Sequence, residues 1–241
     1  MTTDAALAAA YDEARPRLTR MAYAMLGSHA DAEDVVAECW LRLAGANARE
    51  PVRDVEAWAV VAVARCSLDT LRSARRRRET YVGPWLPEPL LAGAGAAPDP
   101  ADRVALEESV SFALLVVLET LSPAERTAWV LHDVFRLEFP EVAAIVGRTP
   151  AAVRQLAARA RRHVAAGVPR IGVDAGEHRA AVAAFAAAAA GGDLAALTAV
   201  LDPRVTLTSD GGGEVNTARR PVAGPDRVAR FVIGAAARFD A

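Results

Sequence analysis

The chain has 241 residues, 53% of them hydrophobic, which is enough to bury a core in one domain or in two to three small ones. Its formal net charge is -2 and its pI is about 6.1, so any nucleic-acid binding must depend on local clusters of charge. All 28 basic residues are Arg, which a GC-rich codon bias explains, so only clustered Arg carries functional weight.

The two cysteines and the apolar stretches argue against a secreted, zinc-binding or membrane protein. Cys39 and Cys66 have neither Cys-x-x-Cys spacing nor a nearby His, so we expect small buried thiols in a reducing cytoplasm. The N-terminus lacks a cationic segment followed by an apolar run. The longest nearly uncharged apolar stretch, 180–190, has 11 residues, and a membrane span needs ~20. We therefore predict a cytoplasmic chain with no membrane partner.

Residues 1–80 predict one helical bundle. Gly27 and Ser28 end a first helix, and Ser28-x-x-Asp31 predicts a capping box at the start of the second. The apolar face of this second helix consists of Val35, Val36, Cys39, Trp40 and Leu43. An acidic stripe lies on another face and consists of Asp31, Asp34 and Glu38. Taken alone, such a stripe is most simply an ordinary exposed helix face.

A third helix is predicted to begin near Asp54. Its apolar positions are Trp58, Val61, Leu68 and Leu71, and it ends in Arg72, Arg75, Arg76, Arg77 and Arg78. A run of cations at a helix C-terminus suits the helix dipole and is usually solvated. In isolation, a solvated helix end and a DNA-binding surface explain this run of Arg equally well.

Residues 81–101 predict a linker, and residues 102–168 a second helical domain. The linker contains Pro84, Pro87, Pro89, Pro98, Pro100, Gly83, Gly93 and Gly95, a composition that sustains neither helix nor strand. Helical periodicity resumes near Asp102. Ser122-Pro-Ala-Glu125 then combines a capping box with proline at the first helical position.

The strongest local motif is a helix-turn-helix that runs from about Phe139 to His163. Gly147 suits a left-handed turn residue, Thr149 can cap the second helix, and Pro150 suits its first position. From Arg148 to Arg170 there are six Arg and no Asp or Glu. A helix in the major groove needs such a face, because phosphates supply most of the affinity and Arg reads guanine edges. Because the helix cap, the turn glycine and the cluster of Arg occur together, we favour a DNA-binding helix over a solvated helix in a bundle.

Residues 174–241 predict an α+β piece. The expected elements are a helix to Ala190, a Gly191-Gly192 stop, a short helix to Leu201, a strand over Val205–Thr208, a turn at Asp210–Gly213 and a helix over Pro225–Ala237. The predicted fold class is therefore mainly α, with two helical domains joined by a Pro/Gly linker and followed by a partial α+β piece.

Three separated segments resemble the extracytoplasmic-function sigma factors of bacterial RNA polymerase. They are Asp31-Ala-Glu-Asp-Val-Val-Ala-Glu-Cys-Trp-Leu-Arg42, the stretch from Ala57-Trp58 to Arg78, and Leu121-Ser-Pro-Ala-Glu-Arg126 through Arg162. The match covers about residues 5–166 in family order. By this resemblance, the first bundle is sigma region two and the second helical domain is region four.

The resemblance implies partners for both domains. Asp31, Asp34 and Glu38 would dock on the β′ clamp helices of core RNA polymerase. The loop 46–53 and the Arg-ended helix would engage the minus-ten element of promoter DNA and help strand opening. Region four would read the minus-thirty-five element and sit on the β flap. The implied DNA-binding residues are Arg53, Arg65, Arg72, Arg75, Arg76, Arg148, Thr149, Arg154, Gln155, Arg159, Arg161 and Arg162.

A narrower resemblance concerns the linker and the third piece. Trp85-Leu-Pro-Glu-Pro89 and Asp210-Gly-Gly-Gly213 resemble the branch of the family with a fused SnoaL-like C-terminal domain. The resemblance implies a regulatory contact made by Trp85, Pro87, Asp210, Gly211 and Gly212. Glu214 stands where a Lys is expected, and the 68 residues of 174–241 are fewer than a SnoaL-like domain needs, so we expect an incomplete domain. A stiff spacer is the simpler alternative for the prolines.

The predicted function is a promoter-specificity factor that recruits core polymerase, with no metal, cofactor or chemistry of its own. One alternative is a helix-turn-helix regulator that binds duplex DNA as a dimer, which has no use for the acidic helix. Another is a SnoaL-type isomerase or cyclase, which needs a buried carboxylate base and an oxyanion partner. Its candidates in the third piece are His178, Asp202 and Asp210, and both Asp residues suit turns better.

Overall fold

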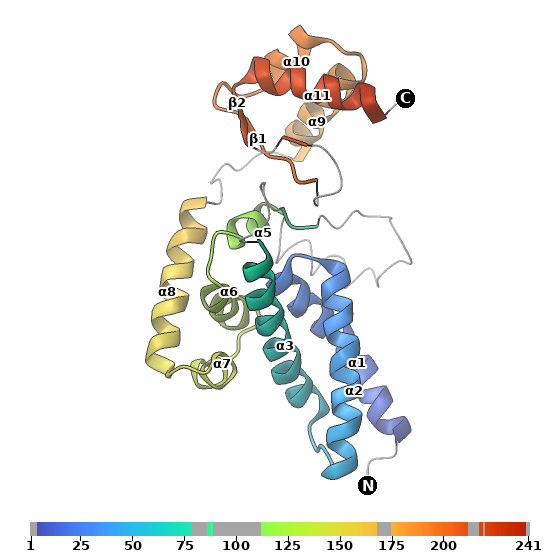
Figure 1. Ribbon diagram of the computed structural model, residues 1–241, viewed down its shortest axis with the longest axis vertical. Coiled ribbons are helices and arrows are strands. Elements are labelled where there is room, and N and C mark those ends of the chain that lie inside the picture. The colour runs from blue at the N-terminus through green and yellow to red at the C-terminus, as the bar shows by residue number, and fades with distance from the viewer. Residues whose placement is uncertain are drawn as a thin grey trace. The chain divides into compact units, whose positions relative to one another are not determined.

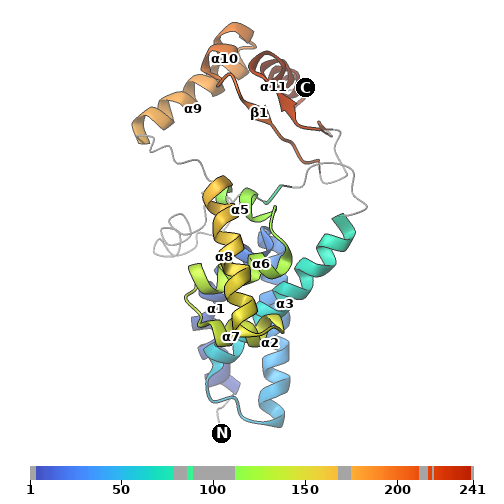
Figure 2. The ribbon, with the colours of Figure 1, turned by 90° about the vertical axis from the view of Figure 1, so that its left-hand side faces the viewer.

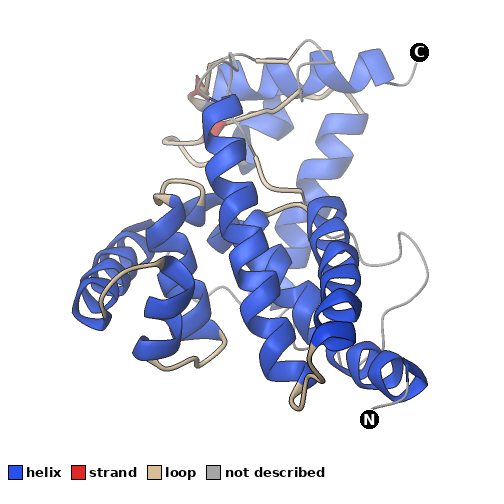
Figure 3. Cartoon of the chain, turned by 60° about the horizontal axis from the view of Figure 1, so that its bottom comes forward, coloured by secondary structure: helices blue, strands red, loops and turns tan. Residues whose placement is uncertain are grey.

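The structure is a computed structural model that describes residues 4–78, 86–88, 112–167, 175–211, 217–218 and 220–239 (Figure 1). The chain divides into two compact units, one formed by residues 1–80 with 87–168 and the other by residues 81–86 with 169–241. Helices make up nearly all the regular structure, as Figure 3 shows, and two short strands lie in the second unit. The prediction of a mainly α fold is confirmed.

Three long helices form the first part of the first unit. They are α1 (Asp4–Leu26), α2 (His29–Arg49) and α3 (Val55–Arg78), and each packs against the other two. The Ser28 hydroxyl accepts a hydrogen bond from the Asp31 N–H at 3.2 Å, so the predicted cap of α2 is confirmed. The Asp54 carboxylate accepts the Ala57 N–H at 2.9 Å and begins α3 where the sequence predicted.

The core of this bundle is built from the apolar faces that the spacing predicted. Val36 and Leu43 of α2 and Leu18 of α1 are buried in the same hydrophobic cluster. Cys39 and Cys66 are both buried free thiols with their sulfurs 3.5 Å apart, which confirms that they serve as small core residues.

Five shorter segments follow in the described residues 112–167 of the first unit: α5 (Phe112–Leu118), α6 (Pro123–Trp129), a π-helical turn η1 (Val130–Val134), α7 (Phe139–Val146) and α8 (Pro150–Gly167). The start of α6 has the predicted capping box in full: the Ser122 hydroxyl accepts the Glu125 N–H, and the Glu125 carboxylate accepts the Ser122 N–H. Figure 2 shows α8 lying against α5 and α6.

The two helical parts of the first unit share one core. Helix α3 packs against α6 and α7, and α1 contacts η1. Buried residues of both parts, such as Met25 and Leu131, belong to a single hydrophobic cluster. The sequence predicted two helical domains joined by a linker, and it contained no signal that these domains bury apolar surface against each other.

The second unit contains α9 (Ala175–Ala190), α10 (Leu194–Val200), β1 (Thr206–Leu207), β2 (Val222–Ala223) and α11 (Pro225–Phe239). The order of the three helices and the first strand was predicted, whereas β2 was not. The predicted strand over Val205–Thr208 is shortened to β1, because the Val205 N–H bonds to the Asp202 carbonyl in a turn at 2.9 Å. β1 pairs with β2 antiparallel, Thr206 opposite Ala223. The core is small and centres on Ala188, Leu197 and Ala229.

Candidate nucleic-acid interface

Helices α7 and α8 form the predicted helix-turn-helix. Gly147 ends α7 with φ at 71°, the left-handed conformation that favours glycine. The Thr149 hydroxyl accepts the Ala152 N–H at 3.2 Å and caps α8, and Pro150 occupies the first helical position. The local residue chemistry therefore sets the tight turn between the helices, which the sequence predicted.

One face of α8 packs into the unit and the opposite face is exposed to solvent. Val153, Ala157 and Ala160 are buried at helical spacing. The exposed face contains Arg154, Gln155, Ala158 and Arg162, and we call it the reading face of α8. The Arg154 guanidinium lies 5.7 Å from the centre of the Phe139 ring, a distance at which a cation is attracted to an aromatic face. Phe139 therefore restrains Arg154 at the start of the reading face.

Other Arg residues of α8 are engaged within the unit. The Arg161 Nε lies 2.6 Å from the Asp133 carboxylate, and an Arg159 nitrogen lies 3.9 Å from Glu125. Their charges are partly neutralised, which makes them weaker candidates for base contacts than Arg154. Arg148 is exposed, and the Thr149 hydroxyl is already used as the cap of α8.

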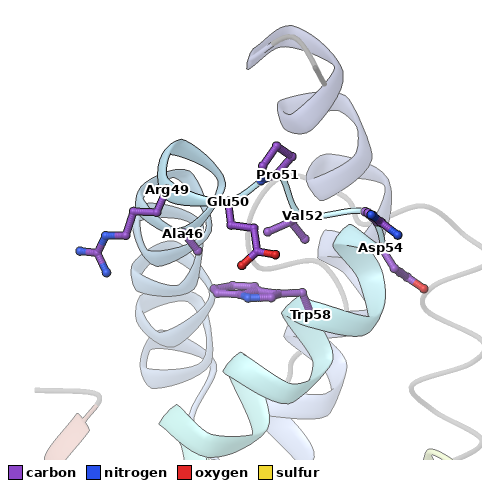
Figure 4. Close-up of a pocket in the computed structure, with 8 residues that line it drawn as sticks. Ala46, Arg49, Glu50, Pro51, Val52, Asp54 and Trp58 are labelled. Carbon is purple, nitrogen blue, oxygen red and sulfur yellow. The ribbon is translucent and has the colours of Figure 1, made fainter.

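A hollow of about 510 Å³ opens where α2 meets α3 (Figure 4). The sequence predicted a loop over residues 46–53, and that boundary is wrong: α2 continues to Arg49, because the Glu50 N–H bonds to the Ala46 carbonyl at 3.0 Å. The side chain of Asn47 braces the shorter loop by accepting the Val52 N–H at 3.0 Å.

Trp58 gives this hollow an aromatic wall that the sequence analysis assigned only to the core. In Figure 4 its ring lies beneath Glu50 and Val52, and the Arg49 side chain points away from it. Trp58 is half-buried, so part of its ring remains accessible in the hollow. Its position four residues after Asp54, the cap of α3, was the sequence signal that could have identified it.

The Arg residues predicted for minus-ten contact differ in what surrounds them. Arg53 lines the hollow and is exposed. Arg65 is exposed and donates a hydrogen bond to the Ala144 carbonyl of α7 at 3.2 Å. Arg72 lies 3.3 Å from the Asp69 carboxylate. Arg75 and Arg76 lie on the last turns of α3, with side chains outside the described part of the chain.

The acidic stripe of α2 is exposed along its length. Asp31, Asp34 and Glu38 all face solvent, and Glu38 pairs with Arg42 at 2.6 Å. Leu41, seven residues after Asp34 and three after Glu38, lies on the same face. It is 70% exposed, the largest value among the exposed large apolar residues of the described chain. Leu41 was not predicted as a site residue, although its spacing from the acidic residues is visible in the sequence.

The predicted linker and the third piece are joined at Asp210, and the regulatory role that the resemblance implied for this contact stays a prediction. The Leu86 N–H donates to the Asp210 carboxylate at 2.9 Å, within the second unit. Gly211 is half-buried beside it. Pro87 is buried within the first unit. Trp85 and Gly212 were predicted to take part and lie outside the described residues.

The three candidate catalytic residues lie at an exposed helix position, in a turn and at the linker contact. His178 is exposed on α9. The Asp202 carboxylate accepts the Arg204 N–H at 2.7 Å, which is the predicted turn. Asp210 holds the linker. In the described ranges, no group of three or more His, Cys, Asp or Glu is arranged to hold a metal ion. No helix in these ranges is long and apolar enough to cross a bilayer.

Both helical parts of the chain match models of known protein families. Residues 10–77 match the family model of Sigma-70 region 2, and residues 111–164 match that of Sigma-70, region 4. The chain is 44% identical over 230 residues to the ECF RNA polymerase sigma factor SigJ of Mycobacterium tuberculosis, covering 95% of this chain and 73% of SigJ. It is 36% identical to the probable ECF sigma factor SigI of the same species, covering 94% and 76%. The crystal structure of SigJ matches with a TM-score of 0.73 at 41% identity, covering 96% and 76%.

Proposed function

Because this chain belongs to the extracytoplasmic-function family of RNA polymerase sigma factors, which bind core polymerase and direct it to promoters, we propose how its exposed surfaces divide that work. The single observation that carries the proposal is the presence, in one compact unit, of an acidic α2 face and a cationic α8 face. The first suits a basic protein partner and the second suits DNA.

The α2 face is proposed to bind core polymerase at the β′ clamp helices. Asp31, Asp34 and Glu38 supply negative charge for a basic helical surface, which favours encounter and correct orientation. Leu41 supplies an exposed apolar side chain at the end of the stripe, and burying it on a partner contributes affinity that charge alone does not. The combination fits a partner whose surface is basic with an apolar recess.

The reading face of α8 is proposed to recognise the minus-thirty-five element in the major groove, with region four seated on the β flap. Arg154, oriented by Phe139, is the best candidate for a bidentate contact to guanine. Gln155 adjoins it on the exposed face and can read adenine. Arg148, in the turn before α8, and Arg162, in the C-terminal half of α8, are both exposed and suit phosphate contacts.

The hollow beside Trp58 is proposed to receive an unstacked base of the minus-ten element. An accessible aromatic ring stacks on any base, and Arg49 and Arg53 line the same hollow and can meet the backbone. Glu50 and Asp54 offset these two charges locally. Most of the attraction to the strand must therefore come from the Arg residues along α3, namely Arg65, Arg72, Arg75 and Arg76.

The second unit is proposed to regulate the sigma factor through the linker, with no catalytic step of its own, in the cytoplasm where polymerase acts. The hydrogen bond between Asp210 and the Leu86 N–H supports this role, because it engages the predicted linker motif. The exposure of His178 and the turn at Asp202 argue against a buried acid-base pair.

Transcription in vitro with purified core polymerase tests the proposal. The chain should give a transcript from a matched promoter, and replacing Asp31 and Asp34 together with Asn should weaken core binding. The same double substitution should leave binding of the chain to a minus-thirty-five duplex unchanged. A stable dimer bound to a palindrome, with no affinity for core, would instead support the helix-turn-helix regulator.

A further inference from the structure

The π-helical turn η1, which precedes the helix-turn-helix, holds a histidine on a braced stretch of backbone. The Phe135 N–H bonds to the Val130 carbonyl at 3.0 Å, which is the i to i+5 hydrogen bond of a π-helix. The Leu137 N–H bonds to the Leu131 carbonyl at 2.9 Å and closes the turn. Single π-helical turns are rare and occur frequently at functional sites. His132 lies in the middle of this turn.

A hydrogen bond orients the imidazole of His132. Its Nδ1 lies 2.8 Å from the carbonyl oxygen of Leu137. Because a carbonyl oxygen can only accept, Nδ1 must carry a proton and donate it. The side chain is also half-buried. Backbone bonds, burial and the Nδ1 bond together leave the ring of His132 little freedom to rotate.

Phe139 packs directly on this oriented ring. The centres of the two rings are 3.8 Å apart, and their planes are tilted by 28°, which is a stacked arrangement. Aromatic pairs stabilise a structure beyond the area that they bury. Phe139 is the first residue of α7 and is half-buried, so the hydrophobic core holds only part of its ring. The stack with His132 supplies a further restraint on Phe139.

Phe139 passes this restraint on to Arg154 of α8. Its ring attracts the Arg154 guanidinium, whose central carbon lies 5.7 Å from the ring centre. His132, Phe139 and Arg154 thus form a continuous series of contacts, which we call the stacking triad. Arg159 and Arg161 lie beside carboxylates, whereas the partner of Arg154 in the triad is an uncharged ring. The triad therefore orders Arg154 without neutralising its charge.

We propose that His132 is a positioning residue for promoter reading: its ring fixes Phe139, and Phe139 holds the Arg154 guanidinium ready for guanine. The inference rests on the function proposed above for the reading face of α8. A side chain that is already ordered loses less conformational freedom on binding, and this saving applies only to a base that fits its orientation. His132 should therefore affect the discrimination between bases more than the affinity for DNA in general.

Binding of the full chain to minus-thirty-five duplexes that differ at single base pairs measures this discrimination. We expect His132→Ala to reduce it about three- to tenfold, the effect of leaving one side chain unordered before binding. The reduction should fall on the base pair that Arg154→Ala also affects, and preferences at the other base pairs should stay unchanged. His163→Ala makes the same chemical change at an exposed position of α8 and is the matched control, with no preference altered.

Two further variants distinguish a positioning role from a merely structural one. His132→Phe keeps an aromatic ring without Nδ1, and it should retain the discrimination because the ring can still stack on Phe139. His132→Ala combined with Arg154→Ala should discriminate no worse than Arg154→Ala alone, because His132 acts through Arg154. A structural residue would instead weaken binding to every duplex alike, and its loss would add to that of Arg154→Ala.

The outcomes separate the role of His132 from the proposed function. If Arg154→Ala relaxes one base pair and a folded His132→Ala variant relaxes none, the positioning role is overturned and the proposed function stands. A loss in His132→Phe as large as that in His132→Ala would also overturn it, because stacking would not be the cause. If His132→Ala does not fold, His132→Leu, which fills the space without an aromatic ring, must still relax the same base pair. No change of preference in Arg154→Ala itself would reject the function proposed for the reading face.

Discussion

Leu41→Ala is the substitution that most directly tests how α2 binds core polymerase. Full burial of a leucine side chain is worth about 1.5–3 kcal/mol. Leu41 is 70% exposed in the free chain, so most of that gain is available to a partner. Because Ala retains part of the contact, we expect a loss of about 1–2 kcal/mol, which is a roughly 5- to 30-fold weaker dissociation constant. The fold should tolerate the change, because Leu41 makes little contribution to the core.

Fluorescence anisotropy of the labelled chain titrated with core polymerase measures the effect. Val182→Ala removes an exposed apolar side chain that is 53% exposed on α9 and serves as the matched control. The melting temperature of both variants should stay unchanged. Equal core affinity for Leu41→Ala and the unmodified chain, together with weaker binding after the Asp31 and Asp34 substitutions, would refute an apolar contribution and leave only the charges.

Three further predictions concern DNA contact and stability. Arg154→Ala should cost about 1–3 kcal/mol at one base pair of the minus-thirty-five site, measured by binding to a set of single-base variants, whereas Arg162→Ala should weaken all sequences alike. Trp58→Leu should reduce permanganate reactivity of the opened minus-ten strand about tenfold, from a stacking loss of about 1–3 kcal/mol, and Trp58→Phe should retain it. Burial opposes ionisation of Glu125, but the hydrogen bonds from Ser122 and nearby positive charge hold its pKa below its ordinary value. Its ionised form therefore stabilises the fold above pH ~4.3, and stability falls as the pH drops through the folded pKa; Glu125→Gln should flatten this acid limb of the melting temperature.

The local elements of this chain are predictable because their signals lie within a few residues. The caps Ser28, Ser122 and Thr149 each begin a helix where expected. Gly147 ends α7 in the left-handed conformation that the tight turn requires. Misplaced boundaries occur where no such residue stands, as at the end of α2, where helical hydrogen bonds continue to Glu50.

The contacts between distant segments are not predictable in the same way. Arg126 meets Ala24, and Arg65 meets Ala144, across 102 and 79 residues of chain. A single Arg within a capping-box helix gives no sign of whether it faces water or a second domain. Glu88 belongs to a motif that resemblance associated with the third piece, yet its own hydrogen bonds lie on the turn between α1 and α2.

The burial of Arg126 is better explained by specificity than by stability. A buried ion pair gains little net free energy, because desolvation of both charges offsets their attraction, and apolar residues of similar volume often stabilise as well or better. The Arg126 position is surrounded by an extensive apolar core, so an apolar side chain could have served to hold the two parts together. A guanidinium accepts only an arrangement that presents acceptors to it, here the Glu119 carboxylate and the Ala24 carbonyl.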